Sequence, residues 1–173
     1  MKYVTTAFLL VAGLALAPAL AGDVPQNGNG EKPDRIVVGY AETITLLDSG
    51  LKVDARMDSG ANTSSMHALN IEYFEREGDD DEWVSFVFEA DGESISLERP
   101  LTRHTRIVQH SGERDRRPVV ELEFCLDGII HRAEFNLTDR SELTYPVLLG
   151  RRFLADAVLI DPAVSKTLSP GCP

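Results

Sequence analysis

Apolar and polar residues alternate in short stretches along much of the chain, and this pattern predicts β-strands. The strictest alternation runs from Leu51 to Met57, as expected for a strand with one buried face. A looser alternation rich in Val, Ile and Thr predicts another strand over 36–47. Asp48-Ser49-Gly50 between the two is typical of a hairpin turn. No long helical period follows, so the pattern predicts an all-β chain.

Later stretches complete the predicted secondary structure. The run 63–68 is expected to be extended, and Asp127-Gly128 is a strong hairpin signal between two strands. Near the end of the chain, 151–157 has the length of one or two helical turns. The other predicted strands are 83–89, 118–126, 129–137, 147–149 and 157–161. We therefore expect an all-β fold with one short C-terminal helix.

Two neighbouring regions of the chain carry opposite charge. Residues 72–93 contain ten Asp or Glu and a single basic residue, Arg76. A solvated hairpin tip is expected in this acidic region, because its spacing does not match a calcium-binding EF-hand loop. Residues 99–117 contain six arginines and two acids. Gly112 lies near the expected tip of a long hairpin over 107–120.

The first 21 residues have the pattern of an export signal. Lys2 precedes an apolar run from Ala7 to Leu16, and small residues stand at the expected cleavage site. Residues 22–34 are rich in Gly, Pro, Asn and charge and predict a disordered leader. One domain over 35–173 follows. We expect a bacterial periplasmic or secreted protein without stable membrane insertion after cleavage; an uncleaved N-terminal anchor is the alternative.

Charge and motif content narrow the chemistry. The formal net charge of −11 argues against nucleic acid or an anionic membrane surface as the main partner. Patterns such as Gly-x-Gly-x-x-Gly, the Walker sequence, Cys-x-x-Cys and His-Glu-x-x-His do not occur in the sequence, which disfavours nucleotide and zinc chemistry. We expect no cofactor and no metal site.

The sequence has two cysteines, Cys125 in a predicted strand and Cys172 at the extreme C-terminus. In an exported protein these residues are expected to form a disulfide that fastens the tail to the sheet. Two separate free thiols are the alternative.

Asp58-Ser59-Gly60-Ala61 directly follows the strictly alternating stretch. An Asp-Ser/Thr-Gly-Ala turn between strands is how aspartic peptidases present a carboxylate at the floor of a cleft. The chemistry needs two carboxylates a few ångströms apart that share one proton, so that one activates water and the other donates to the scissile carbonyl. The chain has one Asp-Ser-Gly, so a working site would need two chains. Asp-Ser-Gly also forms ordinary turns.

Several motifs together make the chain similar to the bacterial retropepsin-like aspartic peptidases, a family often labelled "ATP-dependent zinc protease". The resemblance covers about residues 35–165. It is carried by 52–68, Arg117-Pro118-Val119-Val120, 137–141, Tyr145-Pro146 and 148–154. It implies a retropepsin-like acid protease barrel that acts as an aspartic-type endopeptidase on peptide or protein substrates and forms a homodimer. These residues give no support for the zinc and ATP of the label.

The resemblance also implies roles for single residues. Asp58 would be the catalytic carboxylate, and Ser59 would hydrogen-bond within the turn. Gly60 would let the loop fold closely, and Ala61 would pack beneath it. Gly150 would lie under this loop, where any side chain would push Asp58 away.

One departure from the family concerns Arg151, which would be a buried charge at the helix start. In viral retropepsins, an Asp that follows Asp-Ser/Thr-Gly-Ala pairs with this arginine. The present chain has Asn62 there, which cannot neutralise Arg151, and Asp139 is our candidate for the missing acid. We therefore expect a weak dimer that forms fully with substrate bound.

The basic hairpin over 107–120 is expected to be the flap that covers the substrate, and the acidic region 72–98 to be an inserted hairpin. Gly112 permits the positive φ that a flap turn needs. Arg114 and Arg116 would then face the substrate and favour acidic residues around the cleaved bond. A solvated basic hairpin without this role is the alternative.

Two functional classes follow from these residues. The first is an exported aspartic endopeptidase, and the second is a non-catalytic module that binds a peptide strand in the same cleft. Retention of Asp58, Ser59, Gly60 and Gly150 together favours the enzyme, because a binder needs no aspartate there. A nucleophile pair of Ser64 or Ser65 with His67 is disfavoured, since no orienting acid or Gly-x-Ser-x-Gly elbow accompanies it.

Overall fold

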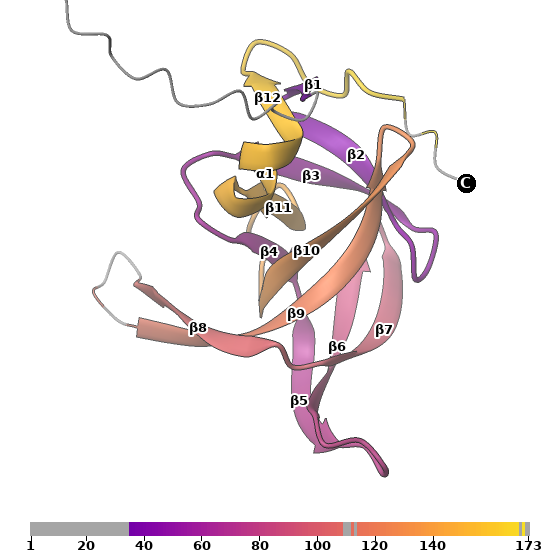
Figure 1. Ribbon diagram of the computed structural model, residues 1–173, viewed down its shortest axis with the longest axis vertical. Helices are drawn as coiled ribbons and strands as arrows, with labels where there is room; N and C mark the ends of the chain where they lie inside the picture. The colour runs from indigo at the N-terminus through magenta and orange to yellow at the C-terminus, as the bar shows by residue number, and fades with distance from the viewer. Residues whose placement is uncertain (1–34, 109–111, 113, 170, 172–173) are drawn as a thin grey trace, which may run out of the picture. The chain divides into compact units, whose positions relative to one another are not determined.

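A seven-stranded sheet carries the Asp58-Ser59-Gly60-Ala61 motif. The computed structural model describes residues 35–108, 112, 114–169 and 171 and arranges their strands in three sheets (Figure 1). The strands of the largest sheet are β2 (Ala41–Leu46), β3 (Lys52–Asp58), β4 (Ser64–His67), β8 (Arg103–Val108), β9 (Arg114–Leu126), β10 (Ile129–Thr138) and β11 (Val147–Gly150). Their order is β10-β4-β11-β3-β2-β9-β8, and β10 also pairs with β9. This extra pairing closes six of the strands into a ring and leaves β8 outside it.

Alternating side chains fill the inside of this ring. In β3, Val53, Ala55 and Met57 are buried, whereas Lys52 and Arg56 on the other face are exposed and Asp54 is half-buried. The other strands supply the remaining core residues, which include Ile44, Met66, Phe124, Phe135 and Leu149. Of these strands, β2, β4 and β11 are buried on both faces for most of their length. Removal of this apolar surface from water is the main stabilising term of the fold. The strict alternation in the sequence therefore predicted both a strand and its buried face.

Two hairpins of the large sheet follow from local turn chemistry. Asp127 and Gly128 both have positive φ, of 53° and 77°, as in the two-residue turn that the Asp-Gly sequence predicts. β9 and β10 continue from it in antiparallel register. The basic hairpin is formed by β8 and β9, which pair from Arg103↔Val119 to Val108↔Arg114. At its tip, Gly112 has a φ of 82°.

The acidic region forms a separate three-stranded antiparallel sheet. We expected an inserted hairpin with two strands, so the inserted element is larger than predicted. Its strands are β5 (Leu69–Glu75), β6 (Glu82–Ala90) and β7 (Glu93–Pro100). Figure 1 shows this sheet beneath the ring of the large sheet. The central strand is amphipathic, with Val84, Phe86 and Phe88 buried. β7 was missed because its many polar residues on the exposed face hide the apolar alternation.

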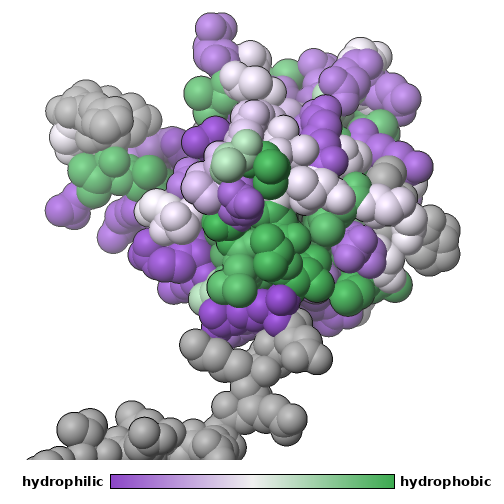
Figure 2. Space-filling model, turned by 90° about the horizontal axis from the view of Figure 1, so that it is seen from above, coloured by the Kyte–Doolittle hydropathy of each residue, from purple (hydrophilic) through white to green (hydrophobic). Residues whose placement is uncertain are grey.

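The stretch 36–47 is two strands and not one. β1 (Ile36–Gly39) pairs in parallel with β12 (Val158–Asp161), while β2 pairs with β3. The chain changes partner at Tyr40, whose amide donates to the carbonyl of Val164 at 2.9 Å. Helix α1 (Arg151–Ala157) leads from β11 into β12, as expected. Viewed from this end of the fold, the surface shows a contiguous apolar area (Figure 2).

A buried carboxylate holds the C-terminal segment to β2. Glu42 is shielded from solvent and accepts hydrogen bonds from the amides of Gly39 and Leu168 and from the amide and hydroxyl of Thr167. Burial alone would raise the pKa of Glu42, but these hydrogen bonds outweigh it and the pKa is lowered. The ionised carboxylate therefore stabilises the fold through its partners.

The fold is the all-β structure with one short helix that the sequence predicted. Within the described residues, none of the helices has the length and apolar character to cross a membrane. The predicted export signal (1–21) and leader (22–34) lie outside the described residues and stay predictions.

Candidate active site

Asp58 is the last residue of β3, and the loop that follows folds back onto its carboxylate. Asp58 Oδ1 accepts hydrogen bonds from the amide of Gly60 at 2.9 Å and from the amide of Ala61 at 3.1 Å. Two backbone donors on one oxygen fix the orientation of the carboxylate relative to the strand. Asp58 is half-buried and Ser59 and Gly60 are exposed, so the turn presents the carboxylate at the surface of this chain.

Gly150 lies against the loop in the position that the resemblance implied. It is the last residue of β11 and is in register with Asp58 on the parallel strand β3. A Cβ on Gly150 would lie 2.4 Å from the carbonyl carbon of Thr63 and 2.9 Å from the amide nitrogen of Ser64. Both contacts are with backbone, which cannot swing aside as a side chain can. Only glycine lets β11 approach the loop this closely.

Polar contacts fasten the same loop to the start of α1. The amide of Arg151 donates to the carbonyl of Ala61 at 2.8 Å, and the amide of Arg152 donates to the carbonyl of Asn62 at 3.1 Å. The amide of Gly150 donates to Ser64 Oγ at 3.1 Å. The first amides of a helix have no partner within the helix. Here the loop after Asp58 supplies a carbonyl acceptor for the amides of Arg151 and Arg152.

Within a single chain, Arg151 is not buried as expected. Its side chain is exposed and donates from Nη1 to the carbonyl of Ser59 at 2.9 Å. A backbone carbonyl at the rim of the loop satisfies the guanidinium, so no buried counter-ion is needed. Asp139 lies elsewhere: its Oδ1 accepts the amide of Ser141 at 2.9 Å and is 3.6 Å from His67 Nδ1. Among the described contacts, Asp139 does not meet Arg151.

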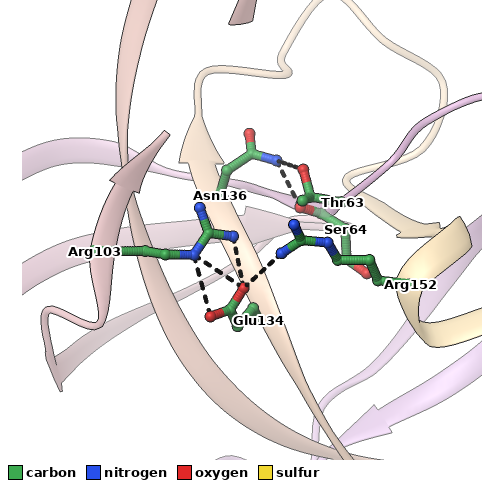
Figure 3. Close-up of polar contacts among 6 residues, drawn as sticks. All are labelled: Thr63, Ser64, Arg103, Glu134, Asn136 and Arg152. Carbon is green, nitrogen blue, oxygen red and sulfur yellow. Dashed lines mark hydrogen bonds and ion pairs between the residues drawn. The ribbon is translucent and has the colours of Figure 1, made fainter. Parts of the chain in front are cut away.

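Asn136 links the basic hairpin to the loop after Asp58. It is buried in β10, and its Nδ2 donates to the carbonyl of Ser64 at 2.6 Å and lies 3.4 Å from Thr63 Oγ1 (Figure 3). Its Oδ1 accepts a hydrogen bond from Arg117 Nη1 at 3.2 Å. Arg117 is in turn paired with Asp115 at 2.6 Å. The chain of contacts Asp115–Arg117–Asn136–Ser64 thus runs from β9 to the strand that follows the loop.

Two arginines share one carboxylate beside this link. Arg103 of β8 makes hydrogen bonds to both oxygens of Glu134, the shortest at 2.6 Å, and Arg152 of α1 is 3.6 Å from the same carboxylate (Figure 3). The Arg103 hydrogen bond lowers the pKa of Glu134 against the opposing effect of burial. The group joins β8, β10 and α1 and carries one more positive than negative charge.

The two faces of the basic hairpin carry different arginines, which corrects the predicted flap residues. Successive side chains of a strand point to opposite faces. Arg117 points to Asn136 and the loop after Asp58, whereas Arg116 points away and reaches His104. Arg114 lies on the face of Arg116. In this chain the residues on the side of the loop are therefore Arg103 and Arg117, and not Arg114 and Arg116.

Arg140 is a buried cation next to the site that sequence analysis did not assign. Its side chain is 9% exposed, and its Nε donates to the carbonyl of Tyr145 at 3.2 Å. Burial lowers the pKa of Arg140, nearby Arg117 lowers it further, and nearby Asp58 raises it. Asp58 is therefore within electrostatic range of the Arg140 guanidinium. The only local signal was an Arg in a polar loop, which predicts exposure rather than burial.

The rival Ser-His reading finds no support in the contacts. Ser64 Oγ accepts the amide of Gly150, and His67 Nδ1 accepts the amide of Arg140 at 2.8 Å. The buried hydroxyl of Ser65 has no hydrogen-bond partner among the described residues. In the part of the chain that the structure describes, no three His, Cys, Asp or Glu side chains are grouped as a metal site.

The structure describes only one of the two cysteines in the predicted disulfide. Cys125 is buried in β9, and Cys172 lies outside the described residues, so the bridge stays a prediction. Gly171, the neighbour of Cys172, lies beside the β9–β10 turn: its carbonyl oxygen is 3.1 Å from the position that a Cβ on Gly128 would take.

Comparisons with known proteins agree with this geometry. Residues 37–169 match the RimB-like family, described as retropepsin-like aspartic endopeptidase RimB. A crystal structure of Lpg0085 from Legionella pneumophila, a protein of unknown function (DUF785), has a TM-score of 0.68 and 32% identity. The match covers 76% of this chain and 97% of the Lpg0085 chain.

Curated relatives carry a different name. Proteins from Desulfotalea psychrophila and Shewanella pealeana, each named probable alpha-L-glutamate ligase, are 34% identical over 137 residues, which is 76% of this chain. A protein of the same name from Parasynechococcus marenigrum is 35% identical over 139 residues. The chain spans under a third of the length of these relatives, 29% or 30% in each case.

Proposed function

Because this chain belongs to the RimB-like family of retropepsin-like aspartic endopeptidases, we propose that it is an exported aspartic endopeptidase whose dyad is Asp58 of two chains. The observation that carries the proposal is the geometry of the catalytic turn. Asp58 Oδ1 is held by two backbone amides, and Gly150 lets β11 support the turn from below. This arrangement orients a carboxylate outward at a strand end, which an ordinary solvated turn does not require.

The proposed chemistry uses one proton shared by the two aspartates. The ionised carboxylate takes a proton from water while the water oxygen attacks the scissile carbonyl carbon. The protonated carboxyl gives its proton to the carbonyl oxygen, which forms a tetrahedral diol. Proton transfer to the amide nitrogen then lets the C–N bond break. Two like charges at short distance favour the singly protonated pair that this cycle needs.

The exposure of the turn supports a two-chain site. Ser59, Gly60 and Arg151 are exposed in the single chain, although they form the part of the site that would have to exclude water. A two-fold axis beside the turn would cover these residues and bring the two Asp58 carboxylates together. The sequence contains one Asp-Ser-Gly, so the second carboxylate would come from a second copy.

Carboxylate-bearing peptides are the substrates that we propose. Arg140 lies within electrostatic range of both Asp58 and Arg117, and Arg103 lies on the same face of the hairpin as Arg117. A guanidinium that has little access to solvent gains most from a carboxylate partner. The name of the curated relatives links this domain to L-glutamate, which agrees with an acidic substrate. Ligase activity is not carried over, because the shared region is under a third of each relative.

Substitution of the proposed catalytic carboxylate tests the function. Mature wild-type protein should cleave peptides from an acidic peptide library, and Asp58→Asn should reduce the rate by at least about 10³-fold, as for other residues at the centre of catalysis. The melting temperature should change little, because Asn can still accept the two loop amides through its side-chain oxygen. Asp54→Asn, on the same strand, is the matched control and should keep the rate.

Two results would contradict the proposal. Full activity in Asp58→Asn would remove the aspartic mechanism. Binding of acidic peptides without cleavage by wild-type protein would favour the non-catalytic binding module. Export is tested separately: after expression with residues 1–34 intact, cell fractionation and N-terminal sequencing should find the chain outside the cytoplasm and cleaved after Ala21.

A further inference from the structure

The inserted three-stranded sheet contacts the back of the basic hairpin through three side chains, which we name the hairpin latch: Tyr73 of β5, His104 of β8 and Arg116 of β9. The rings of Tyr73 and His104 are stacked, with centroids 5.7 Å apart and planes at 28°. His104 Nε2 is 3.3 Å from Tyr73 Oη, and Arg116 Nη2 is 3.1 Å from His104 Nδ1. The latch therefore joins two sheets that share no backbone ladder.

The hydrogen bonds fix the protonation state of His104 in the latch. A guanidinium can only donate, so Nδ1 of His104 must accept from Arg116. The neutral imidazole then carries its proton on Nε2, which donates to Tyr73 Oη. A protonated imidazole would turn an N–H towards Arg116 and place two cations in contact. Protonation of His104 and the Arg116 contact are thus mutually exclusive.

Among the described residues, the hydrogen-bond partners of His104 include no acid that would favour its cation directly. Arg106 on its own strand and Arg116 on β9 line the same hollow as His104, Tyr73 of β5 stacks on its ring, and Glu82 of β6 acts on Tyr73. Burial raises the pKa of Tyr73, so the phenol stays neutral. His104, Thr105, Arg106 and Arg116 line an open hollow of about 570 Å³, so protons from solvent reach the imidazole.

The latch acts on the catalytic face because Arg116 and Arg117 are neighbours on one strand. Arg116 is held from behind by the inserted sheet, and Arg117 reaches Asn136 and the catalytic loop from the front. Movement of β9 at Arg116 therefore displaces Arg117 as well. The Arg116–His104 and Arg117–Asn136 contacts therefore hold β9 from opposite faces.

We propose that Tyr73 and His104 are positioning residues that hold the hairpin in its resting place, and that protonation of His104 releases the hairpin. This inference rests on the proposed function, since hairpin position affects turnover only if the hairpin covers a substrate. At neutral pH the latch keeps Arg117 beside the catalytic loop. On acidification the latch opens and affinity for carboxylate-bearing peptides falls.

Hydrogen exchange of the β8 and β9 amides tests the latch without any need for catalysis. Protection is compared between about pH 5.5 and 8, where histidines ordinarily titrate, after correction for the intrinsic pH dependence of exchange. Wild-type protection should fall about two- to five-fold at the acidic end, the size expected for loss of an exposed hydrogen bond. Tyr73→Phe should show part of this loss at every pH, and Tyr40→Phe, which removes a hydroxyl elsewhere, should show none.

Two substitutions of His104 separate its charge from its packing. His104→Asn keeps an acceptor for Arg116 near the position of Nδ1 but loses the Tyr73 contacts and cannot titrate, so hairpin protection should fall at least as far as in Tyr73→Phe and lose its pH dependence. His104→Phe keeps the stacked ring without an acceptor, so protection should stay low at all pH values. Equal protection in wild type and His104→Phe across the pH range would overturn the latch.

Peptide kinetics add a readout that a merely structural role would not change. In wild type, KM for acidic peptides should rise two- to five-fold on acidification while kcat follows the carboxylate pair, a change of about the size of one exposed hydrogen bond. The rise in KM should be absent in His104→Asn. If no peptide is cleaved, the proposed function fails and hydrogen exchange alone still decides the latch. A KM that rises equally in wild type and His104→Asn would contradict the latch.

Discussion

The corner formed by Asp58, the loop after it and Gly150, and the basic hairpin of this protein, are held in place by contacts of different kinds. The corner depends on backbone: Gly150 touches the main chain of Thr63 and Ser64, and two amides bind Asp58 Oδ1. The hairpin depends on side chains, namely Arg117 with Asn136 on one face and Arg116 with His104 on the other. Backbone contacts leave few alternative positions, whereas polar side chains near solvent exchange partners at little cost. The corner should therefore tolerate little change, and the hairpin should be adjustable.

The largest expected effect is at Gly150. Gly150→Ala would press a methyl group into the backbone of Thr63, so the loop or β11 must shift, at a cost of about 3 kcal/mol. Chemical denaturation should show this loss, and peptide cleavage should fall with it. Gly171→Ala is the matched control, because a Cβ there would meet nothing closer than 3.8 Å. Wild-type stability in Gly150→Ala would mean that the corner is less closely packed than described.

A smaller loss is expected at the carboxylate that fastens the C-terminal segment. Glu42→Gln replaces one acceptor oxygen with a donor that faces other donors, which should cost about 2 kcal/mol near pH 7. Because the pKa of Glu42 is lowered in the folded protein, its contribution is present above the unfolded value and is lost as pH falls through the folded value. Denaturation from pH 7 down to pH 3 should therefore bring wild type and variant together.

Glu89→Gln is the control for this titration, since Glu89 is exposed. Its stability should follow that of wild type at every pH. A constant gap between Glu42→Gln and wild type down to pH 3 would show that the charge of Glu42 plays no part.

The smallest expected effect compares the two faces of the hairpin. Arg117→Gln should lower the preference for acidic over neutral peptides by about ten-fold, roughly 1.4 kcal/mol, because it removes a charge on the side of the catalytic loop. Arg114→Gln removes a charge from the opposite face and should change the preference by less than about two-fold. Equal effects of the two substitutions would show that substrate meets both faces, and a larger effect of Arg114→Gln would restore the original assignment.

The sequence predicted those parts of the fold that local chemistry determines. Strict alternation over 51–57 identified β3 and its buried face, and Asp127-Gly128 identified the β9–β10 hairpin. The sequence did not predict pairings between distant segments. Nothing in the stretch 36–47 indicates that Ile36–Gly39 would pair with Val158–Asp161. A partner change at Tyr40 depends on Val164, more than a hundred residues away.

In the candidate site, too, the sequence predicted features that depend on local motifs and missed those that depend on distant partners. Asp58 and Gly150 were found because a short motif fixes backbone shape as well as chemistry. The burial of Arg140 and Glu42 was missed, since charged residues ordinarily face water and only three-dimensional partners reverse that preference. Arg114 and Arg116 were chosen for their charge alone, and the face of each residue followed only from the register of β8 with β9.

A mixing experiment tests the central claim that one site uses Asp58 from two chains. Wild-type protein is equilibrated with Asp58→Asn protein, and peptide cleavage is measured per wild-type chain. Random exchange of subunits would leave about half of the activity at equal amounts and about a quarter with a three-fold excess of the variant, since only wild-type pairs hold two aspartates. Activity per chain should also fall on dilution. Activity that is unaffected by any excess of Asp58→Asn, and strictly linear in enzyme concentration, would contradict a shared dyad and require a second acid from within the chain.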